Sequence, residues 1–414
     1  MFFFVNILIL FSISLNLHIK MIIFLVQLLE ILYNEHGDYM IYLDYSATTP
    51  VRKEVLESFE KTCLEYVGNS NSLHSLGVAS HQLETSATIQ IANLLGVKPE
   101  EIIYTSGASE SNNLAIKGIS MQYQNRGKHI ITTNLEHSSI YGPFTYLQKQ
   151  GFEISIVEAN DDGIIDLKTL QKMIRPDTIL VSIASVNSET GLRQPVEEIG
   201  KILKQYEKCF FHVDITQSLG KVDVSLENID LASFSAHKFY GLKGIGCLIK
   251  KEKIIVEPLI HGGKSTTPFR SGTPALPLIV SLAKALRLSL EEEPEALLNV
   301  KELCQKLITK LSKYPDVTIN HNEYCIPHIL NISTLLIKPE TMLHALEEHD
   351  IFISTQSACS SNHSESRAVL ELTKNHSCAE HSLRISLSGF TTNSEIDTFL
   401  ECFDTCYHNL KIRS

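Results

Sequence analysis

The chain has 414 residues, which is long enough for two domains that share a large hydrophobic core. Hydrophobic residues make up 43% of it and charged residues 20%, a balance typical of a globular protein and not of a disordered one. The formal net charge of -11 at pH 7 argues against the basic surface that broad nucleic-acid binding needs, so we expect no direct nucleic-acid partner.

Residues 1–39 differ from the rest of the chain in composition. Residues 1–33 are rich in Phe, Ile and Leu, but Lys20 divides them into apolar runs that are short for the ~20 residues of a membrane span. A secretory signal would need a basic start and a clear small-residue cleavage site, and residues 1–33 have neither. We therefore interpret residues 1–39 as a hydrophobic extension from a mis-assigned start, with translation beginning at Met40. The alternative of a membrane tether stays open, although we expect no membrane partner.

Between residues 44 and 263, short apolar stretches alternate with amphipathic ones. The candidate strands are residues 101–105, 129–133, 153–157, 178–184, 210–213, 231–235 and 246–249. Helical periodicity fills gaps between them, for example at residues 110–124 and 196–206. This alternation predicts an α/β fold with a mostly parallel seven-stranded sheet that is covered on both faces. Ligands of such sheets bind outside the carboxyl ends of the strands.

The pattern changes after Gly272-Thr273-Pro274. A long helical region at residues 278–311 contains a charged interruption at residues 291–295. Shorter units follow, with strands at 329–332, 352–355 and 383–387 and helices at 340–348, 366–372 and 395–410. We therefore predict a large domain at residues 40–273 and a smaller α+β domain at residues 274–414. The N-terminal segment of the large domain is a candidate to pack with the small one.

A run of small and polar residues follows the first candidate strand, from Ser106 to Asn112. We expect a helix to begin there at Ser109 or Glu110. The free N–H groups of a helix start, together with the Ser109 hydroxyl, are suited to a phosphate group. An ordinary capped helix has the same pattern, so this segment alone leaves both interpretations open.

Two further strand ends carry residues with a more specific chemistry. Asp214 ends an apolar strand, where a desolvated carboxylate needs a cationic partner such as a protonated pyridine nitrogen. Lys238 follows the next strand in the run Ser235-Ala236-His237-Lys238, and a lysine there could form a Schiff base. A single lysine is usually a solvated surface group. The pairing of these two strand ends is harder to explain without a cofactor.

At this point the chain resembles the cysteine desulfurase family of class V, fold-type I pyridoxal-phosphate enzymes. The resemblance covers residues 40–409 and depends on several motifs together. They are the runs 42–50, 105–113, 186–191, 212–217, 235–238 and 270–273, the pair Glu136-His137, and Ser357-Ala358-Cys359. It implies a large domain with a mostly parallel sheet, a smaller C-terminal domain, a homodimer and the cofactor pyridoxal 5'-phosphate.

The resemblance also implies roles for individual residues. Lys238 would hold the cofactor and move the α-proton of the substrate, Asp214 would pair with the pyridine nitrogen, and Gln217 would bind the phenolic oxygen. His137 would stack on the ring and assist proton transfers at sulfur. The phosphate would be held by Ala108, Ser109, Ser235 and His237, with Thr273 arriving from the other subunit. Asn187 and Arg384 would bind the carboxylate of L-cysteine, since a guanidinium donates two parallel hydrogen bonds.

Nine cysteines are present without any CxxC pair, so we expect no structural zinc or other metal and a reducing, cytoplasmic location. Cys359 lies in a run of Ser, Asn and His that has no apolar periodicity, which favours a nucleophile over a buried structural cysteine. The resemblance implies that Cys359 takes the sulfur of cysteine as a persulfide and leaves alanine.

Three segments depart from the family pattern. Lys264-Ser265-Thr266-Thr267 replaces a glycine followed by a Gln-Glu or His-Glu pair, Gly389 stands where a basic residue is common, and residues 68–74 lack a usual proline. The departure at residues 264–267 makes the dimer-facing side of the site harder to predict. None of the three includes Lys238, Asp214, His137 or Cys359.

Several interpretations of the sulfur's destination and of the activity stay open. The chain ends at Ser414 soon after its last candidate helix, and the Ser-Ala-Cys-Ser-Ser loop resembles relatives that feed tRNA 4-thiouridine synthesis. We therefore favour tRNA thiolation over delivery to an iron–sulfur scaffold protein. A selenocysteine lyase or another class V lyase is the alternative enzyme, and a degenerate membrane-tethered scaffold is the non-enzyme alternative.

Overall fold

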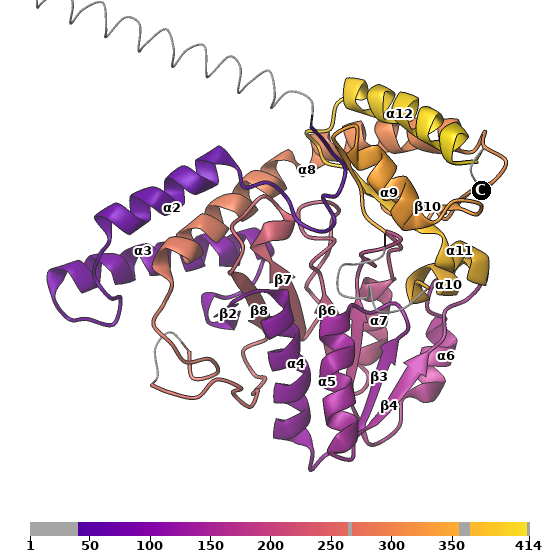
Figure 1. The fold of residues 1–414 in the computed structure, drawn as a ribbon. Coiled ribbons are helices and arrows are strands. Elements are labelled where there is room, and N and C mark those ends of the chain that lie inside the picture. Colours follow the sequence, from indigo (N-terminus) through magenta and orange to yellow (C-terminus); the bar gives the residue numbers. More distant parts are fainter. Residues whose placement is uncertain (1–39, 264–266, 356–364, 412–414) are drawn as a thin grey trace, which may run out of the picture.

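The computed structural model describes residues 40–263, 267–355 and 365–411 (Figure 1). The expectations for residues 1–39, for Cys359 and for Lys264, Ser265 and Thr266 lie outside these residues. Among the helices of the described ranges, none has the length and apolar composition to cross a bilayer.

A seven-stranded sheet is the centre of the larger part, and its strand order is β2-β8-β7-β6-β5-β3-β4. The strands are β2 (Ile102–Thr105), β3 (His129–Thr133), β4 (Glu153–Val157), β5 (Thr178–Ala184), β6 (Phe210–Asp214), β7 (Leu231–Ser235) and β8 (Gly246–Lys250). β8 is antiparallel to both of its neighbours, whereas the pairs from β7 to β4 are parallel. The prediction of a mostly parallel seven-stranded sheet is confirmed.

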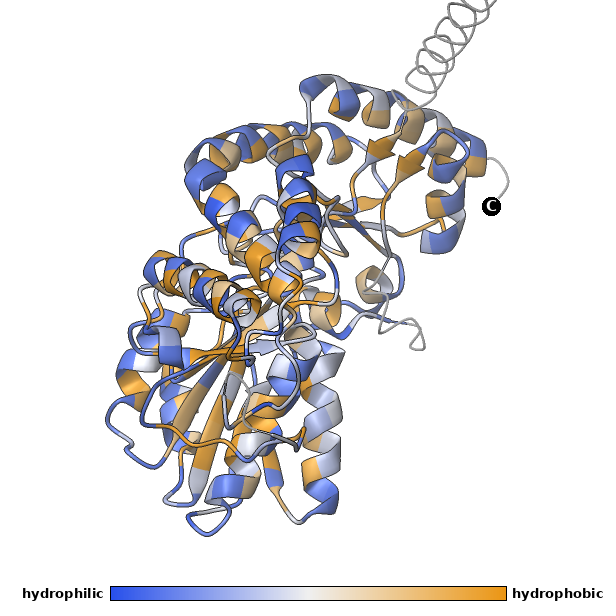
Figure 2. Cartoon of the chain, turned by 90° about the vertical axis from the view of Figure 1, so that its left-hand side faces the viewer, coloured by the Kyte–Doolittle hydropathy of each residue, from blue (hydrophilic) through white to orange (hydrophobic). Residues whose placement is uncertain are grey.

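Helices cover both faces of this sheet because successive residues of its strands point in opposite directions. Ile130 and Leu180 belong to one apolar cluster and the adjacent Ile131 and Val181 to another. α4 (Ala108–Tyr123) and α5 (Ser138–Lys149) contribute to the first cluster, while α3 (Ser75–Leu95), α7 (Val196–Leu203) and the start of α8 (Leu276–Leu311) contribute to the second. Figure 2 shows the apolar strands between helices with hydrophilic outer faces.

The C-terminal part has its own small core. Its antiparallel sheet has the order β12-β10-β9, made of β9 (Val317–Ile319), β10 (Ile329–Thr334) and β12 (Ser382–Ser386). α9 (Pro339–Glu347) and α12 (Asn393–Lys411) cover it, and α10 (Arg367–Thr373) and α11 (His376–Glu380) lie at its edge (Figure 1). The first described strand, β1 (Ile41–Tyr42), pairs with β11 (Ile351–Phe352), so the N-terminal segment joins this part. The division of the chain at residue 273 stays a prediction.

One helix connects the two cores. α8 is continuous over 36 residues and contains Pro294, so the charged residues 291–295 do not break it. Leu282 and Leu286 pack in the core of the large sheet, and Leu303 and Leu307 pack in the small core. α2 (Lys53–Glu65) and α3 pack along the first half of α8, and α6 (Leu167–Met173) packs on β4.

Several predicted boundaries were wrong by one to three residues; the helix expected at residues 196–206, for example, ends at Leu203. The helix expected at residues 110–124 begins at Ala108, because Gly107 ends the extended segment after β2. The strand expected at residues 352–355 ends at Phe352, and Ser354 forms only an isolated bridge with Arg384.

Candidate active site

A cavity of about 470 Å³ lies at the carboxyl ends of the large sheet, where the N-terminal segment and the small core meet it. Nearly all of the predicted site residues within the described ranges line it: Ala108, Ser109, His137, Asn187, Asp214, Gln217, Ser235, His237, Lys238 and Arg384. Thr273 is exposed and does not line this cavity. Cys359 lies outside the described residues.

The start of α4 forms one wall of the cavity. Gly107 is the residue before this helix, and no side chain caps the helix start. The first N–H groups of a helix, here those of Ala108 and Ser109, have no acceptor within the helix. A Cβ on Gly246 would lie 2.5 Å from the carbonyl oxygen of Phe234 and 2.7 Å from the Cα of Gly107. The absence of a side chain at Gly246 therefore lets the helix start approach the sheet, and this cradle fits a phosphate group.

Asp214 is the last residue of β6 and is buried. Its carboxylate accepts hydrogen bonds from Asn112 Nδ2 at 2.8 Å and from the Thr216 N–H at 2.9 Å. Among the described residues, no lysine or arginine forms an ion pair with it. The Thr216 hydroxyl also lines the cavity and is buried without a partner in the described part of the chain. A buried carboxylate in this setting fits the protonated pyridine nitrogen of pyridoxal phosphate.

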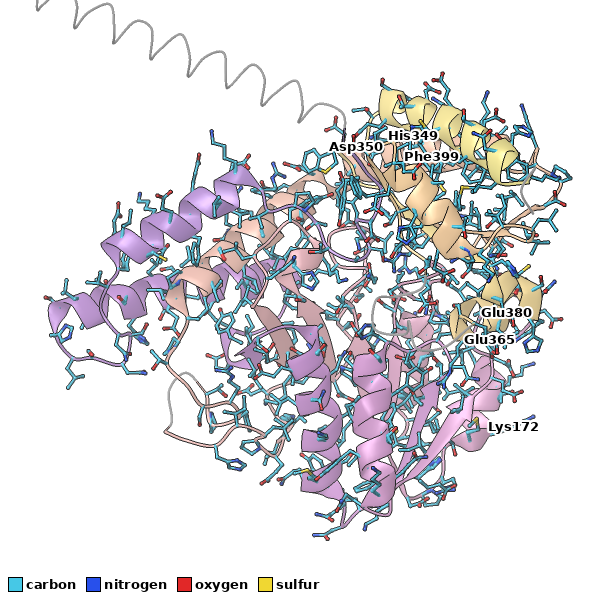
Figure 3. All side chains as sticks on the ribbon, viewed as in Figure 1. Lys172, His349, Asp350, Glu365, Glu380 and Phe399 are labelled. Atoms are coloured by element: carbon cyan, nitrogen blue, oxygen red, sulfur yellow. The ribbon has the colours of Figure 1, made fainter. Side chains whose placement is uncertain are left out.

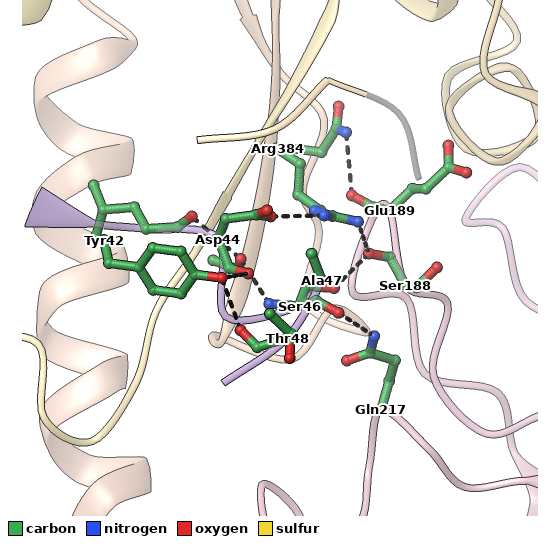
Figure 4. A network of polar contacts seen from close by, with 12 residues as sticks. Tyr42, Asp44, Ser46, Ala47, Thr48, Ser188, Glu189, Gln217 and Arg384 are labelled. Atoms are coloured by element: carbon green, nitrogen blue, oxygen red, sulfur yellow. Dashed lines mark hydrogen bonds and ion pairs between the residues drawn. The ribbon is translucent and has the colours of Figure 1, made fainter. Parts of the chain in front are cut away.

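Lys238 follows β7 in a short turn, and its Nζ donates to the carbonyl oxygens of Ser46 at 2.7 Å and Ala47 at 2.6 Å. The same Ser46 oxygen accepts a hydrogen bond from Gln217 Nε2 at 2.9 Å. Both side chains are thus held by one backbone carbonyl of the N-terminal segment, and Figure 4 shows the contact between Ser46 and Gln217. These contacts place the lysine inside the cavity and not on the surface.

His137 precedes α5 and accepts a hydrogen bond at Nδ1 from the Ser139 N–H at 3.2 Å. Since a backbone N–H can only donate, a neutral ring carries its proton on Nε2. Burial lowers the pKa of His137; Asp214 opposes this effect and Lys238 adds to it. The neutral imidazole is therefore the form expected at neutral pH. Burial also lowers the pKa of His237 to about 4, with Lys238 contributing.

Arg384 comes from β12 of the small core and is almost fully buried. It donates to Asp44 Oδ1 at 2.8 Å and to the Ser188 carbonyl at 3.0 Å (Figure 4). Its Nε is buried and has no partner within the described residues. A guanidinium with an unused donor in the cavity wall is suited to an incoming carboxylate.

Asn187 lines the cavity, but its side chain is used within its own turn. Its Nδ2 donates to the Leu135 carbonyl at 2.8 Å, and its Oδ1 accepts from the N–H groups of Glu189 and Thr190, each at 2.9 Å. The predicted contact with the substrate carboxylate stays a prediction for this residue. In this structure the amide holds the loop that carries Ser188.

Sequence reasoning assigned no role to several residues of the site. Ser46 acts through a carbonyl group, which leaves no signal in the sequence. Glu136, next to His137, is buried, and it accepts hydrogen bonds from Thr133 Oγ1 at 2.7 Å and the Ala184 N–H at 3.1 Å. Burial raises the pKa of Glu136 to about 8 despite these donors. Its position beside a motif histidine was the signal that could have identified it. Across the described ranges, no cluster of three metal-binding side chains is present.

A family model described as Aminotransferase class-V matches residues 41–399. A protein named cysteine desulfurase IscS from Glaesserella parasuis is 42% identical over 376 residues, 87% of this chain and 91% of that protein. A solved structure of a NifS-like protein superposes with a TM-score of 0.84 at 34% identity, over 90% of this chain and 100% of that one. A structure described as SspA in complex with cysteine gives a TM-score of 0.74 at 31% identity, over 85% and 100% of the two chains.

The buried carboxyl group of Glu136 gives a prediction about stability and pH. Its folded-state pKa of about 8 lies above the ordinary value of 4.5, so the folded state holds a proton that the unfolded state loses between these pH values. The free energy of unfolding therefore falls as pH rises through this window, by up to about 1.4 kcal/mol for each pH unit. We expect Glu136→Gln to remove this slope, and urea unfolding at several pH values measures it.

The control for this prediction is Glu198→Gln on the exposed face of α7, which should keep the wild-type slope. A Glu136→Gln variant whose stability runs parallel to that of the wild type across the whole window would show that the carboxyl group is ionised in the folded protein.

Proposed function

The chain belongs to the class V aminotransferase family and is a pyridoxal-phosphate-dependent cysteine desulfurase, and from this we propose that it takes sulfur from L-cysteine with Cys359 and passes it to an acceptor protein. The observation that carries this proposal is the single cavity that brings together Lys238, Asp214, His137 and Arg384. Given these residues and relatives named cysteine desulfurase, the degenerate-scaffold alternative has no support.

Each side chain has a chemical task in this proposal. Bound pyridoxal phosphate supplies an electron sink for bonds at the α-carbon of an amino acid. The α4 start with Ser235 and His237 holds the phosphate, and Asp214 keeps the ring nitrogen protonated. Arg384 orients the carboxylate of cysteine, and Lys238 removes the α-proton and returns it during the reaction. The neutral His137 offers its Nε2 for proton transfers at sulfur.

Sulfur transfer needs a nucleophile beyond these residues, and Cys359 fills that role. Its thiolate attacks the sulfur of the substrate, so that an S–S bond forms while the Cβ–S bond breaks. The electron pair of the broken bond stays with the carbon skeleton, which gains protons and leaves as alanine. The sulfur remains on Cys359 as a persulfide.

The anchors on both sides of residues 356–364 support this assignment. Before them, Ser354 exchanges two backbone hydrogen bonds with Arg384, at 3.1 and 2.7 Å. After them, Ser366 Oγ donates to Glu189 Oε2 at 2.5 Å, next to Ser188 in the cavity wall. Figure 3 labels Glu365, the first described residue after the segment, near α10 and α11. Thr355 and Cys359 are four residue steps apart in the sequence, a reach of up to about 14 Å, and we infer from the two anchors that this reach allows the thiol to serve the cavity.

We expect Cys359→Ala to bind the cofactor with unchanged visible absorbance and to form no persulfide. Alanine production should fall at least about a hundredfold, because the substrate sulfur loses its acceptor nucleophile. Absorbance, alanine release and mass spectrometry of the protein measure these properties. Cys63→Ala, at an exposed cysteine of α2, is the matched control and should keep full activity. Wild-type turnover of Cys359→Ala would contradict the assignment.

We further propose that the acceptor serves tRNA thiolation and not iron–sulfur cluster assembly. The support is the Ser-Ala-Cys-Ser-Ser segment around Cys359, which resembles that of relatives feeding 4-thiouridine synthesis. A cytoplasmic location agrees with the free thiols of the eight cysteines in the described part of the chain.

The acceptor proposal is tested with purified protein and radiolabelled cysteine. We expect labelled sulfur to pass to a tRNA 4-thiouridine synthase at least about tenfold faster than to an iron–sulfur scaffold protein. Separation of the proteins on a non-reducing gel measures both transfers. Equal or faster labelling of the scaffold protein would contradict the proposal, and Cys359→Ala is the control that should label neither.

A homodimer is the third part of the proposal, and exposed apolar side chains around α2 and α3 support it. Leu64 is 72% exposed, Val67 73% and Leu73 97%, with Leu76 and Val78 also exposed. Several exposed apolar side chains within residues 64–78 are a feature typical of a protein interface. Thr273 does not line the cavity of its own chain, as expected for a residue contributed to the partner's phosphate site.

We expect the double change Val67→Glu and Leu73→Glu to shift the protein from dimer to monomer, because each carboxylate would be desolvated at the interface. Cofactor binding should then weaken at least about tenfold, because the monomer lacks the Thr273 that the other subunit contributes. Light scattering after gel filtration and fluorescence titration with pyridoxal phosphate measure the two effects. Leu298→Glu, 65% exposed on α8, is the control. A double variant that remains dimeric would place the interface elsewhere.

A further inference from the structure

A buried lysine lies behind the wall of the cavity. Lys221 is 7% exposed and lines a second cavity of about 440 Å³, together with Lys238, Tyr240 and His328. Lys221 does not line the first cavity, whereas Lys238 lines both. A lysine is seldom buried without a partner, so its contacts need an explanation.

The contact of Lys221 is with the amide of Gln217. Lys221 Nζ donates to Gln217 Oε1 at 2.6 Å. The two residues are four positions apart in the turns that follow β6, and backbone bonds from Ser218 N–H to the Ile215 carbonyl and from Lys221 N–H to the Ser218 carbonyl, both about 3 Å, hold these turns. Gln217 Nε2 donates in turn to the Ser46 carbonyl at 2.9 Å.

These two contacts determine which way the amide faces. Below its pKa of about 7, Lys221 is an ammonium group with donors alone, and a backbone carbonyl is an acceptor alone at any pH, so Oε1 faces Lys221 and Nε2 faces Ser46. A flipped amide would set an N–H group against the ammonium and an oxygen against the carbonyl, which costs both hydrogen bonds. Nε2 carries two hydrogens, and one remains for a group in the cavity that Gln217 lines.

We propose that Lys221 is a positioning residue that fixes the amide of Gln217 so that an N–H group, and not a carbonyl, is presented to the phenolic oxygen of the cofactor. The proposal rests on the role of Gln217 in the proposed function and extends it by one residue. Lys221 itself does not line the first cavity, so it acts through Gln217.

The surroundings of Lys221 argue against a role in stability. Burial lowers the pKa of Lys221 to about 7, and the positive charges of Lys238 and Arg384 add to this effect. Within the described part of the chain, no carboxylate forms an ion pair with it. A buried ammonium without an anionic partner costs free energy, so replacement by an apolar side chain of similar length should leave the protein folded.

The test uses Lys221→Met and Lys221→Gln as holoenzymes, with the visible absorbance of bound pyridoxal phosphate recorded against pH. If the carbonyl of the Gln217 amide faced the phenolic oxygen, the pKa at that oxygen would be higher than when an N–H group donates to it. We therefore expect the pH midpoint of the absorbance change to rise by about one unit in Lys221→Met, the equivalent of one lost hydrogen bond. Lys221→Gln can donate or accept and should give a smaller shift in the same direction.

Lys250→Met is the matched control, because Lys250 is also a buried lysine of the large core and donates to the Ile254 carbonyl at 2.8 Å, away from the cavity. It should leave the midpoint unchanged. The same shift in Lys250→Met, or no shift in either Lys221 variant, would overturn the proposal.

A double-mutant cycle separates this inference from the role of Gln217 itself. Gln217→Ala alone should move the midpoint, and Lys221→Met should add nothing in that background. If Gln217→Ala has no effect, the role of Gln217 in the proposed function fails. If Gln217→Ala shifts the midpoint and Lys221→Met adds its full shift to it, Lys221 acts independently and the positioning role is overturned.

Discussion

The carbonyl oxygen of Ser46 accepts hydrogen bonds from Lys238 and from Gln217, and most of the site is organised around it. The Ser46 hydroxyl donates to the Ser188 carbonyl, which also accepts from Arg384, and the Ser46 N–H donates to Ser386 Oγ. One residue of the N-terminal segment therefore contacts strand ends of the large sheet and a strand of the small one. A carbonyl suits this position because it has two lone pairs and no charge that a nearby lysine could neutralise.

The ionisable groups around the cavity share one physical cause, which is desolvation. Burial lowers the pKa values of His137, His237 and Lys221 and raises that of Glu136. Each shift favours the neutral form, so that fixed charge in the site is confined to few groups. A site that holds a charged cofactor and a zwitterionic amino acid is then dominated by the charges of those ligands and of Asp214 and Arg384.

The sequence predicted the large sheet well, because strands buried on both faces are continuous apolar runs with polar residues at their ends. Asp214 and Lys238 could be located from those ends alone, whereas the helix start after β2 was placed at Ser109 or Glu110 and lies at Ala108. Ser46 could not, since its carbonyl is common to every residue type. Lys221 also escaped prediction, because a lysine in a sequence is normally exposed and burial depends on distant segments. The charged residues around Pro294 suggested an interruption that packing on both sides overrides.

The continuity of α8 also constrains how the halves of the molecule move. The helix packs in the large core at Leu282 and in the small core at Leu303. If either core rotates, the end of α8 that packs in it must move with it. Pro294 lies between Leu282 and Leu303 and has no N–H to donate to the preceding turn. Because one backbone hydrogen bond is missing there, α8 bends most easily at this residue. Arg384 belongs to the far side of that pivot and Lys238 to the near side. A small bend of one helix would therefore change the distance between Arg384, the proposed ligand of the substrate carboxylate, and Lys238, the proposed carrier of its α-proton.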